Sequence, residues 1–443
     1  MRKEWADLSP DEKREERFKQ WLSPLDVKFS SMEAEKGYKE RATRFIKAIK
    51  LEEPDRVPVI LPAAFFPAYH AGITLQTAIY DYDELSHAWL KFLHDFDMDT
   101  FFGPALILPG KVFEALDYKL YKWPGHGLSS DVSSYQFVEG EYMKADEYDA
   151  LLQDPSDFWL RTYLPRVFGA FEPFQKLSPF TTIVEIPTAY FMPYTMADVQ
   201  DSLQALIDAG RETEKWLEAV GEVGRASLES GYPSIWGGLA KAPFDTLGDT
   251  LRGTQGIMTD MYRQPDKLLE AVERITPLTI KAAVASADSA RCPVVMMPLH
   301  KGADGFMSGK QYETFYWPTL KKVIMALIGE GIVPMLFAEG SYNTRLEIIK
   351  DLPRGAVIWY FDQTNMAKAK EVLGGTACIA GNVPVSMLCT GTPQTVKEYC
   401  RQLIEVVGKG GGYILAGGAN MDEGNPDNLR AMMAAATEYG VYK

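Results

Sequence analysis

Glu339 is the residue of this sequence best suited to acid–base chemistry. It directly follows an apolar run, in the segment Phe337-Ala338-Glu339-Gly340. Burial among apolar neighbours raises the pKa of a carboxyl group toward neutrality, where it can donate and accept protons, and a carboxylate can also hold a metal ion. The alternative role for Glu339 is a salt bridge to Lys301 or Arg345.

Two further catalytic candidates, His300 and Asp304, follow the preceding apolar run, residues 294–299. If consecutive runs form neighbouring parallel strands, His300 and Glu339 lie at adjacent strand ends. The pair could transfer protons, and with other carboxylates it could bind zinc. Ligands that come from separate strands leave no spacing pattern in a sequence, so the presence of a metal stays open at this stage.

Polar residues also follow other apolar runs, and we predict that they bind the substrate. In barrel enzymes the loops after the carboxyl ends of the strands carry the working residues. His87 and His94, by contrast, lie in an amphipathic segment and are predicted to be surface groups. The substrate-binding candidates are Tyr69, His70, His126, Asp362, Asn382, Asn420 and Asp422.

Eight short apolar runs alternate with amphipathic, helix-like segments after residue 56. This alternation is typical of βαβ units in a parallel sheet, and eight runs predict a closed (β/α)8 TIM barrel. The runs are residues 57–61, 100–106, 234–239, 294–299, 333–337, 356–361, 377–380 and 413–416.

A long stretch, about residues 120–230, interrupts this alternation and predicts an insertion over one barrel mouth. It is rich in aromatic residues, such as Tyr135 and Trp159, and contains a ninth apolar run at residues 181–186. Aromatic walls suit an aromatic or a cationic ligand. A plain structural core is the alternative role of these side chains.

The first 40 residues differ from the rest and predict a helical arm, with the barrel spanning residues 41–443. The first 50 positions carry 13 Lys and Arg and 10 Asp and Glu. Ser9-Pro10-Asp11-Glu12 has the pattern of a helix cap and first turn, and Phe18, Trp21 and Leu22 share one helix face. The arm is expected to pack on the barrel or to clasp a second copy in a homodimer, with contact to a lipid surface as a further alternative.

Composition excludes several classes of protein. With 443 residues, 46% hydrophobic and 24% charged, the chain has the material for a large folded core. Its net charge of −14 argues against binding nucleic acid. Four cysteines without a C-x-x-C pair argue against a disulfide framework or a zinc knuckle, and no apolar stretch is long enough to cross a membrane. A cytoplasmic enzyme with a small-molecule substrate is therefore expected.

Several segments in their order along the chain resemble the uroporphyrinogen decarboxylase superfamily, which also contains corrinoid-dependent methyltransferases. The resemblance covers residues 40–440 and implies a (β/α)8 barrel, in agreement with the eight apolar runs. The segments are Glu53-Pro54-Asp55-Arg56-Val57-Pro58-Val59, Ala242-Pro243-Phe244 (Gly-Pro-Phe in the family), Tyr316-Trp317-Pro318-Thr319-Leu320-Lys321, Gly381-Asn382-Val383-Pro384, Gly391-Thr392-Pro393, Gly412-Tyr413-Ile414-Leu415 and Pro426-Asp427-Asn428-Leu429-Arg430-Ala431-Met432.

The sequence departs from both branches of this superfamily. The resemblance implies arginines after the first strand and an aspartate after the second in the decarboxylases, but residues 62–70 contain no Arg and the second loop is Phe102-Gly103-Pro104-Ala105. A substrate with many carboxylates needs cationic partners. The methyltransferases bind zinc through a His-x-Cys and a later Cys; the matching positions here are Phe337-Ala338-Glu339 and Ala419. Activation of a thiol by that zinc is therefore not expected.

Three functions remain open from the sequence. The first is a methyltransferase that moves a methyl group between a small methylated substrate and a corrinoid protein, with Glu339 as the acid and His300 or a differently bound metal assisting. The second is a decarboxylase or lyase acting on a carboxylic acid, with Glu339, His300 or Asp304 transferring protons. The third is a noncatalytic barrel that binds a tetrapyrrole or a corrinoid.

Overall fold

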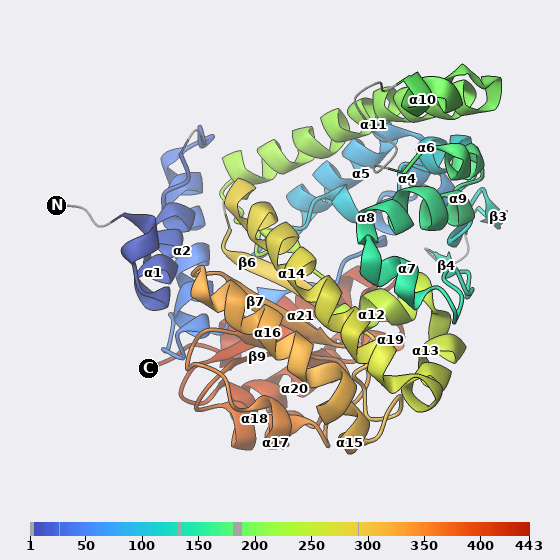
Figure 1. Cartoon of the computed structure of the whole chain (residues 1–443). Coiled ribbons are helices and arrows are strands. Elements are labelled where there is room, and N and C mark those ends of the chain that lie inside the picture. Colours follow the sequence, from blue (N-terminus) through green and yellow to red (C-terminus); the bar gives the residue numbers. More distant parts are fainter. Residues whose placement is uncertain (1–3, 26, 131–134, 180–187, 291) are drawn as a thin grey trace.

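A curled sheet of seven parallel strands forms the centre of the computed structural model, which describes residues 4–25, 27–130, 135–179, 188–290 and 292–443 (Figure 1). Seven of the eight predicted runs contain a strand, and the TIM-like barrel fold is confirmed. In spatial order the strands are β1 (Val59–Ile60), β10 (Tyr413–Gly417), β9 (Cys378–Val383), β8 (Ile358–Phe361), β7 (Val333–Ala338), β6 (Val294–Leu299) and β5 (Gly238–Leu239).

The predicted strand at residues 100–106 is wrong. The segment lies between β1 and the chain before β5, but side chains rather than a strand ladder join it to its neighbours. Asp99 accepts the backbone N–H of Val59 at 2.8 Å, and the Thr100 hydroxyl donates to the carbonyl of Pro233 at 2.8 Å. Side chains that take backbone partners compete with ladder pairing, and Pro104 has no N–H to donate. The barrel wall is therefore completed at this point by an irregular segment.

Strand residues alternate between the barrel interior and the surrounding helices. Met335 and Phe337 of β7 belong to an inner apolar cluster, whereas Leu336 and Ala338 pack in the outer cluster with the helices. This period of two is the geometry of a β-strand. The helices that follow β5 to β10 are α12 (Pro243–Asp245), α13 (Gly253–Arg263), α14 (Pro265–Ser289), α15 (Gly309–Gln311), α16 (Trp317–Gly329), α17 (Leu346–Ile349), α18 (Met366–Leu373), α19 (Val385–Thr390), α20 (Pro393–Leu403) and α21 (Pro426–Tyr439).

The N-terminal arm closes the end of the barrel where the strands begin. It consists of α1 (Pro10–Leu22) and α2 (Met32–Ile49), and the predicted Ser9 cap is confirmed as a capping box with Glu12. Phe18 and Trp21 are buried in the inner cluster together with the first residues of the strands. The turn into β7 is so close that a Cβ atom on Gly331 would lie 2.5 Å from the carbonyl carbon of Lys13. The arm thus forms the floor of its own barrel (Figure 1).

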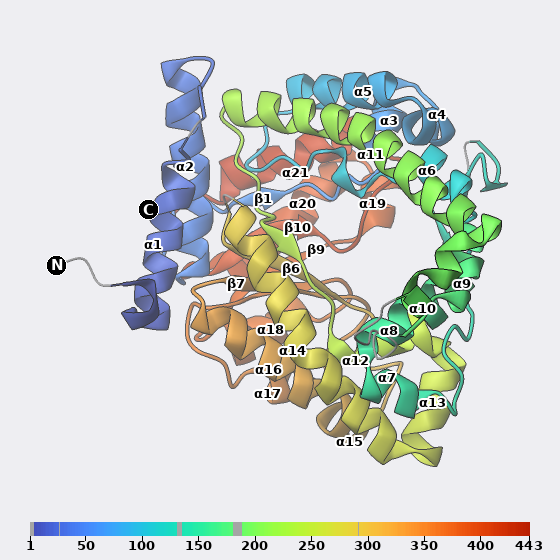
Figure 2. The same ribbon diagram turned by 45° about the horizontal axis from the view of Figure 1, so that its top comes forward.

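The stretch that interrupts the alternation forms its own layer of short strands and helices, which includes part of the wall around the opposite end of the barrel. Figure 2 shows α11, its longest helix, beside α5. The predicted ninth run, residues 181–186, lies outside the described residues. The elements of this stretch are β2 (Tyr121–Pro124), β3 (Gly127–Leu128), β4 (Gln136–Phe137), α7 (Tyr148–Gln153), α8 (Pro155–Phe158), α9 (Leu164–Val167), α10 (Thr188–Phe191) and α11 (Ala197–Glu229). The helices between β1 and this stretch are α3 (Phe66–Ala71), α4 (Leu75–Tyr80), α5 (Tyr82–Asp95) and α6 (Gly110–Ala115).

No helix among the described residues combines the length and the apolar character that crossing a membrane requires.

Candidate active site

Polar side chains continue the inner rows of three adjacent strands at their carboxyl ends. Glu339 comes two residues after the inward-facing Phe337, and Asp362 two residues after the inward-facing Tyr360. His300 continues the inner row of β6 from Met296 in the same way. The period of two therefore directs all three side chains toward the barrel mouth. Because β6 and β7 pair directly, the prediction that His300 and Glu339 lie at adjacent strand ends is confirmed.

His300 joins two carboxylates through its two ring nitrogens. Its Nδ1 lies 2.6 Å from Oδ2 of Asp249, and its Nε2 lies 3.5 Å from Oε1 of Glu339. Asp249, on the helical turn after β5, also pairs with Lys241 at 2.8 Å and Lys301 at 3.0 Å. Glu339 is thus paired with His300 and not with Lys301 or Arg345.

The charges of this group favour an imidazolium form of His300. Burial lowers the pKa of His300, but the hydrogen bonds and the negative charges of Asp249 and Glu339 outweigh it and raise the pKa to about 10. Burial would raise the pKa of Asp249, but His300 and Lys241 hold it below its ordinary value. At neutral pH His300 therefore carries a proton on Nε2, directed at Glu339.

Asp245 holds the turn that carries His300. Its carboxylate accepts the backbone N–H groups of His300 and Lys301, each at 3.0 Å, and the hydroxyl of Tyr316 at 2.7 Å. Burial and the nearby charge of Asp249 raise the pKa of Asp245 to about 6. Sequence reasoning missed Asp245 and Asp249, although Asp245 directly follows the Ala242-Pro243-Phe244 segment and Asp249 comes one helical turn later.

A cavity of about 510 Å³ lies at the barrel mouth. Its polar wall includes three carboxylates, and its apolar wall includes three aromatic rings. The residues that line it are Ala64, Phe65, Leu106, Ile107, Tyr135, Phe337, Glu339, Asp362, Ala419, Asn420 and Asp422. No Lys, Arg or His is among these described lining residues. A smaller apolar chamber of about 40 Å³ shares Phe337 and Asn420 with it and reaches Phe102, Trp236 and Tyr360 inside the barrel.

The structure brings together five of the predicted site residues around this cavity. Glu339, Asp362, Asn420 and Asp422 line it. Asn382 lies beside Asp362, because its amide nitrogen donates to the backbone carbonyls of Asp362 and Thr364, each at 2.9 Å. His300 contacts Glu339 and is the sixth predicted residue of this group, so two of the three catalytic candidates and four of the seven substrate-binding candidates form one site.

Four other predicted site residues have different partners and do not line the cavity. His70 pairs with Asp95 at 2.7 Å on the outer face of α5, and Tyr69 beside it is half exposed. His126 stacks on Trp123 with ring centroids 4.3 Å apart. Asp304 accepts hydrogen bonds from Ser341 at 2.8 Å and from Thr344 at 2.6 Å, which tie the loop after β6 to the loop after β7. The surface placement predicted for His87 and His94 is confirmed.

The donor set at the mouth does not fit the zinc site implied by the methyltransferase resemblance. Glu339 and Ala419 stand at the matching positions, and both ring nitrogens of His300 already face carboxylates. The described residues contain no group of three or more His, Cys, Asp or Glu side chains arranged to hold a metal ion. We therefore derive no chemical step through zinc.

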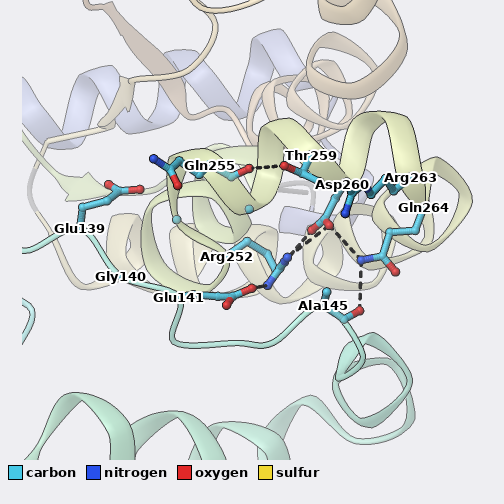
Figure 3. A pocket seen from close by; sticks show the side chains of 12 residues that line it. Glu139, Gly140, Glu141, Ala145, Arg252, Gln255, Thr259, Asp260, Arg263 and Gln264 are labelled. Carbon is cyan, nitrogen blue, oxygen red and sulfur yellow. Dashed lines mark hydrogen bonds and ion pairs between the residues drawn. The ribbon is translucent and has the colours of Figure 1, made fainter.

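A second cavity, of about 640 Å³, lies between residues 139–145 and α13, outside the barrel (Figure 3). Arg252 is buried there and donates to Asp260 at 2.5 Å, to Glu141 and to the carbonyl of Met143. Asp260 in turn accepts from Gln264 at 2.9 Å. Since its buried charges are already paired with each other, this cluster clamps the loop rather than presenting free groups to a ligand.

A parallel barrel with acid–base groups at the carboxyl ends of its strands is the architecture of a TIM-barrel enzyme. The family model described as uroporphyrinogen decarboxylase (URO-D) matches residues 183–439, and the chain belongs to this family. A curated relative, the uroporphyrinogen decarboxylase of Syntrophotalea carbinolica, is 23% identical over 209 residues, which are 46% of this chain and 59% of the relative. The match thus spans less than two thirds of that protein.

A solved structure, a methyltransferase from Methanosarcina mazei, shares the fold. It has 17% sequence identity and a TM-score of 0.55, over 90% of this chain and 98% of the other. This likeness shows a shared fold, and a fold alone does not define the reaction, so the activity has to be argued from the residues of the site.

The raised pKa of His300 predicts a pH-dependent contribution to stability. Because the pKa is raised in the folded state, the ionic contacts of His300 contribute their full stabilisation of the fold below the ordinary imidazole pKa. This contribution is lost as the pH rises through about 10. We expect the difference in unfolding free energy between the wild type and His300→Gln to be largest near pH 6 and to shrink toward pH 10.5, measured by urea denaturation. His94→Gln, at an exposed site on α5, is the control. A difference that grows with pH would contradict this assignment.

Proposed function

We propose that the protein is a methyltransferase that moves a methyl group from a small substrate in the mouth cavity to a corrinoid carried by a separate protein. One observation carries the proposal. The proton-transfer pair His300 and Glu339 lies at a cavity whose described lining residues include no cationic side chain. The fold shared with the methyltransferase from Methanosarcina mazei is compatible with this class of reaction, and the family membership is compatible with it and with decarboxylation.

The negative charge of the cavity wall argues against the alternative function, a decarboxylase. A decarboxylase must bind the carboxylate of its substrate, which requires Arg, Lys or another strong donor to replace water. Glu339, Asp362 and Asp422 line the cavity instead. Three carboxylates would repel such a substrate at neutral pH.

The residues of this chain can activate the leaving heteroatom. When the bond between methyl carbon and heteroatom breaks, the electron pair stays on the heteroatom, which needs a proton or a positive charge to leave. His300 holds a proton at Nε2, 3.5 Å from Glu339, and Glu339 faces the cavity. Glu339 would pass this proton to the heteroatom, and the Asp249 carboxylate would keep the imidazole ring oriented.

The cavity has room for the substrate only. Its volume of about 510 Å³ falls in the range of small-ligand pockets, and a corrin macrocycle with its side chains exceeds it. The corrinoid would supply the nucleophile that accepts the methyl group. The exposed Asn420 at the cavity wall shows that the site opens to solvent, so a second protein can reach it.

Anoxic absorption spectroscopy tests the proposal. The purified protein is mixed with cob(I)alamin and a panel of methylated amines, ethers and thiols, and formation of the methylated corrinoid is followed in time. We expect one class of donor to be demethylated at a rate proportional to enzyme concentration. Release of carbon dioxide from a panel of carboxylic acids, with no demethylation of any donor, would overturn the proposal in favour of a decarboxylase.

A further inference from the structure

The mouth cavity presents hydrogen-bond acceptors far more than donors. Its side chains offer three carboxylates, from Glu339, Asp362 and Asp422. The hydroxyl of Tyr135 is already engaged, because it donates to the carbonyl of Leu106 at 2.7 Å and accepts from the N–H of Leu108. Among the described lining residues, the amide of Asn420 is the remaining side-chain donor. A ligand that fits this wall must bring donors or positive charge.

Asn382 adds an independent sign of a missing donor. It is 8% exposed, and its Oδ1 has no hydrogen-bond partner among the described residues. The assignment of this oxygen is secure, because the amide nitrogen already faces two carbonyl oxygens, those of Asp362 and Thr364. Cys378 and Ala380, two and four residues earlier, belong to the inner cluster, so the side chain of Asn382 points into the barrel. A buried acceptor without a partner is costly. Asn382 does not itself line the mouth cavity but bonds to the backbone of Asp362, which does, so this acceptor lies next to the carboxylate wall.

The apolar part of the wall also suits a cation. Phe65 and Tyr135 meet edge to face with ring centroids 5.3 Å apart, and Phe337 and Tyr360 pack in a tilted arrangement with ring centroids 4.7 Å apart. Aromatic faces attract alkylated ammonium groups, most strongly where water is excluded. Burial and the charge of Glu339 raise the pKa of Asp362, which a bound cation would counteract.

We propose that the substrate held in this cavity is a methylated amine in its protonated, ammonium form, with its N–H directed at the carboxylates and its methyl groups against the aromatic rings. This inference rests on the proposed methyltransferase function and specifies its substrate class. On transfer, the bond between nitrogen and the methyl carbon breaks and its electron pair stays on nitrogen. The nitrogen already carries its proton and leaves as a neutral amine, so this class of donor takes no proton from Glu339, and the methyl group would pass to the corrinoid nucleophile.

Three ligands with one branched skeleton and different charges test the inference without any corrinoid. They are N,N-dimethylethanolamine, which is a cation at pH 7.5, neutral 3-methylbutan-1-ol and anionic 3-methylbutanoate. Isothermal titration calorimetry with the full chain should show the amine binding at least about tenfold more tightly than the alcohol. Equal binding of the amine and the alcohol, or tighter binding of the carboxylate, would overturn the inference.

Two variants of carboxylates in the cavity wall test whether the amine binds in the mouth cavity. Asp362→Asn and Glu339→Gln should each weaken binding of the amine by about tenfold, because each removes a charged hydrogen-bond acceptor. Glu218→Gln, an exposed carboxylate on α11, is the matched control and should bind as the wild type does. Unchanged binding in both cavity variants would overturn the inference even if the amine binds.

The outcomes separate this inference from the function on which it rests. Methyl transfer from an ether or a thiol, without binding of the amine, would refute the substrate class and leave the methyltransferase in place. Binding of the amine that is lost in Asp362→Asn, together with no methyl transfer from any donor, would support a cation site and refute the methyltransferase.

Discussion

The Glu339→Gln variant is expected to lower kcat for methyl transfer by about 10²–10⁴-fold, the usual contribution of a positioned acid–base group. Glutamine keeps the shape of the side chain but lacks the carboxylate, which would orient an ammonium donor or pass the proton of His300, 3.5 Å away, to an ether or thioether donor. The His300→Gln variant should show a loss of similar size, because the two residues act as one unit. The measurement is the initial rate of corrinoid methylation at saturating donor.

The matched control for this prediction is Glu313→Gln, an exposed carboxylate outside the mouth cavity, which should retain wild-type kcat. Glu339 is itself half exposed, so loss of its ion pair with His300 should lower the unfolding free energy by less than about 1 kcal/mol. A Glu339→Gln variant with full activity would remove the acid–base role from this residue. Losses in the two single variants that multiply in the double variant would contradict the paired action of His300 and Glu339.

The second large effect concerns stability. Asp260→Asn is expected to lower the free energy of unfolding by about 3–5 kcal/mol, because it leaves the buried Arg252 without its main counter-charge. The guanidinium lies 2.5 Å from Asp260, and both side chains are almost fully buried (Figure 3). Urea denaturation followed by circular dichroism gives the value.

A compensating variant separates loss of charge from loss of packing at this site. Replacing both partners, as in Arg252→Met with Asp260→Leu, should recover part of the lost stability, because no unpaired charge stays buried. Asp201→Asn, on the exposed side of α11, should change stability by less than about 0.5 kcal/mol. A loss below about 1 kcal/mol in Asp260→Asn would show that the Arg252 cluster does not clamp the loop at residues 139–145.

The sequence predicts the barrel and the core of its site because both depend on short-range patterns, namely the spacing of the apolar runs and the two-residue alternation along each strand. Apolar runs with the right spacing become strands, and residues two positions beyond an inward-facing apolar residue, such as Glu339 and Asp362, must also face inward. The adjacency of His300 and Glu339 follows from the pairing of consecutive parallel strands. These inferences need no knowledge of distant contacts.

Other parts of the site depend on tertiary contacts that no local pattern records. Asp249 reaches His300 from a helical turn 51 residues earlier in the chain. His70 follows the first strand, as a site residue would, but α3 turns it toward Asp95 on the outer side. Residues 100–106 look like a strand by composition, yet the side chains of Asp99 and Thr100 take the backbone partners that a strand would use.

The helical floor built by α1 and α2 has a kinetic consequence. Because Phe18 and Trp21 fill the end where the strands begin, the described residues close the barrel at that end. Under the proposed function, a small donor would enter, and its demethylated product would leave, through the mouth that a docked acceptor protein would cover. Steady-state kinetics should therefore follow a compulsory order, in which the small molecule binds first and is released last.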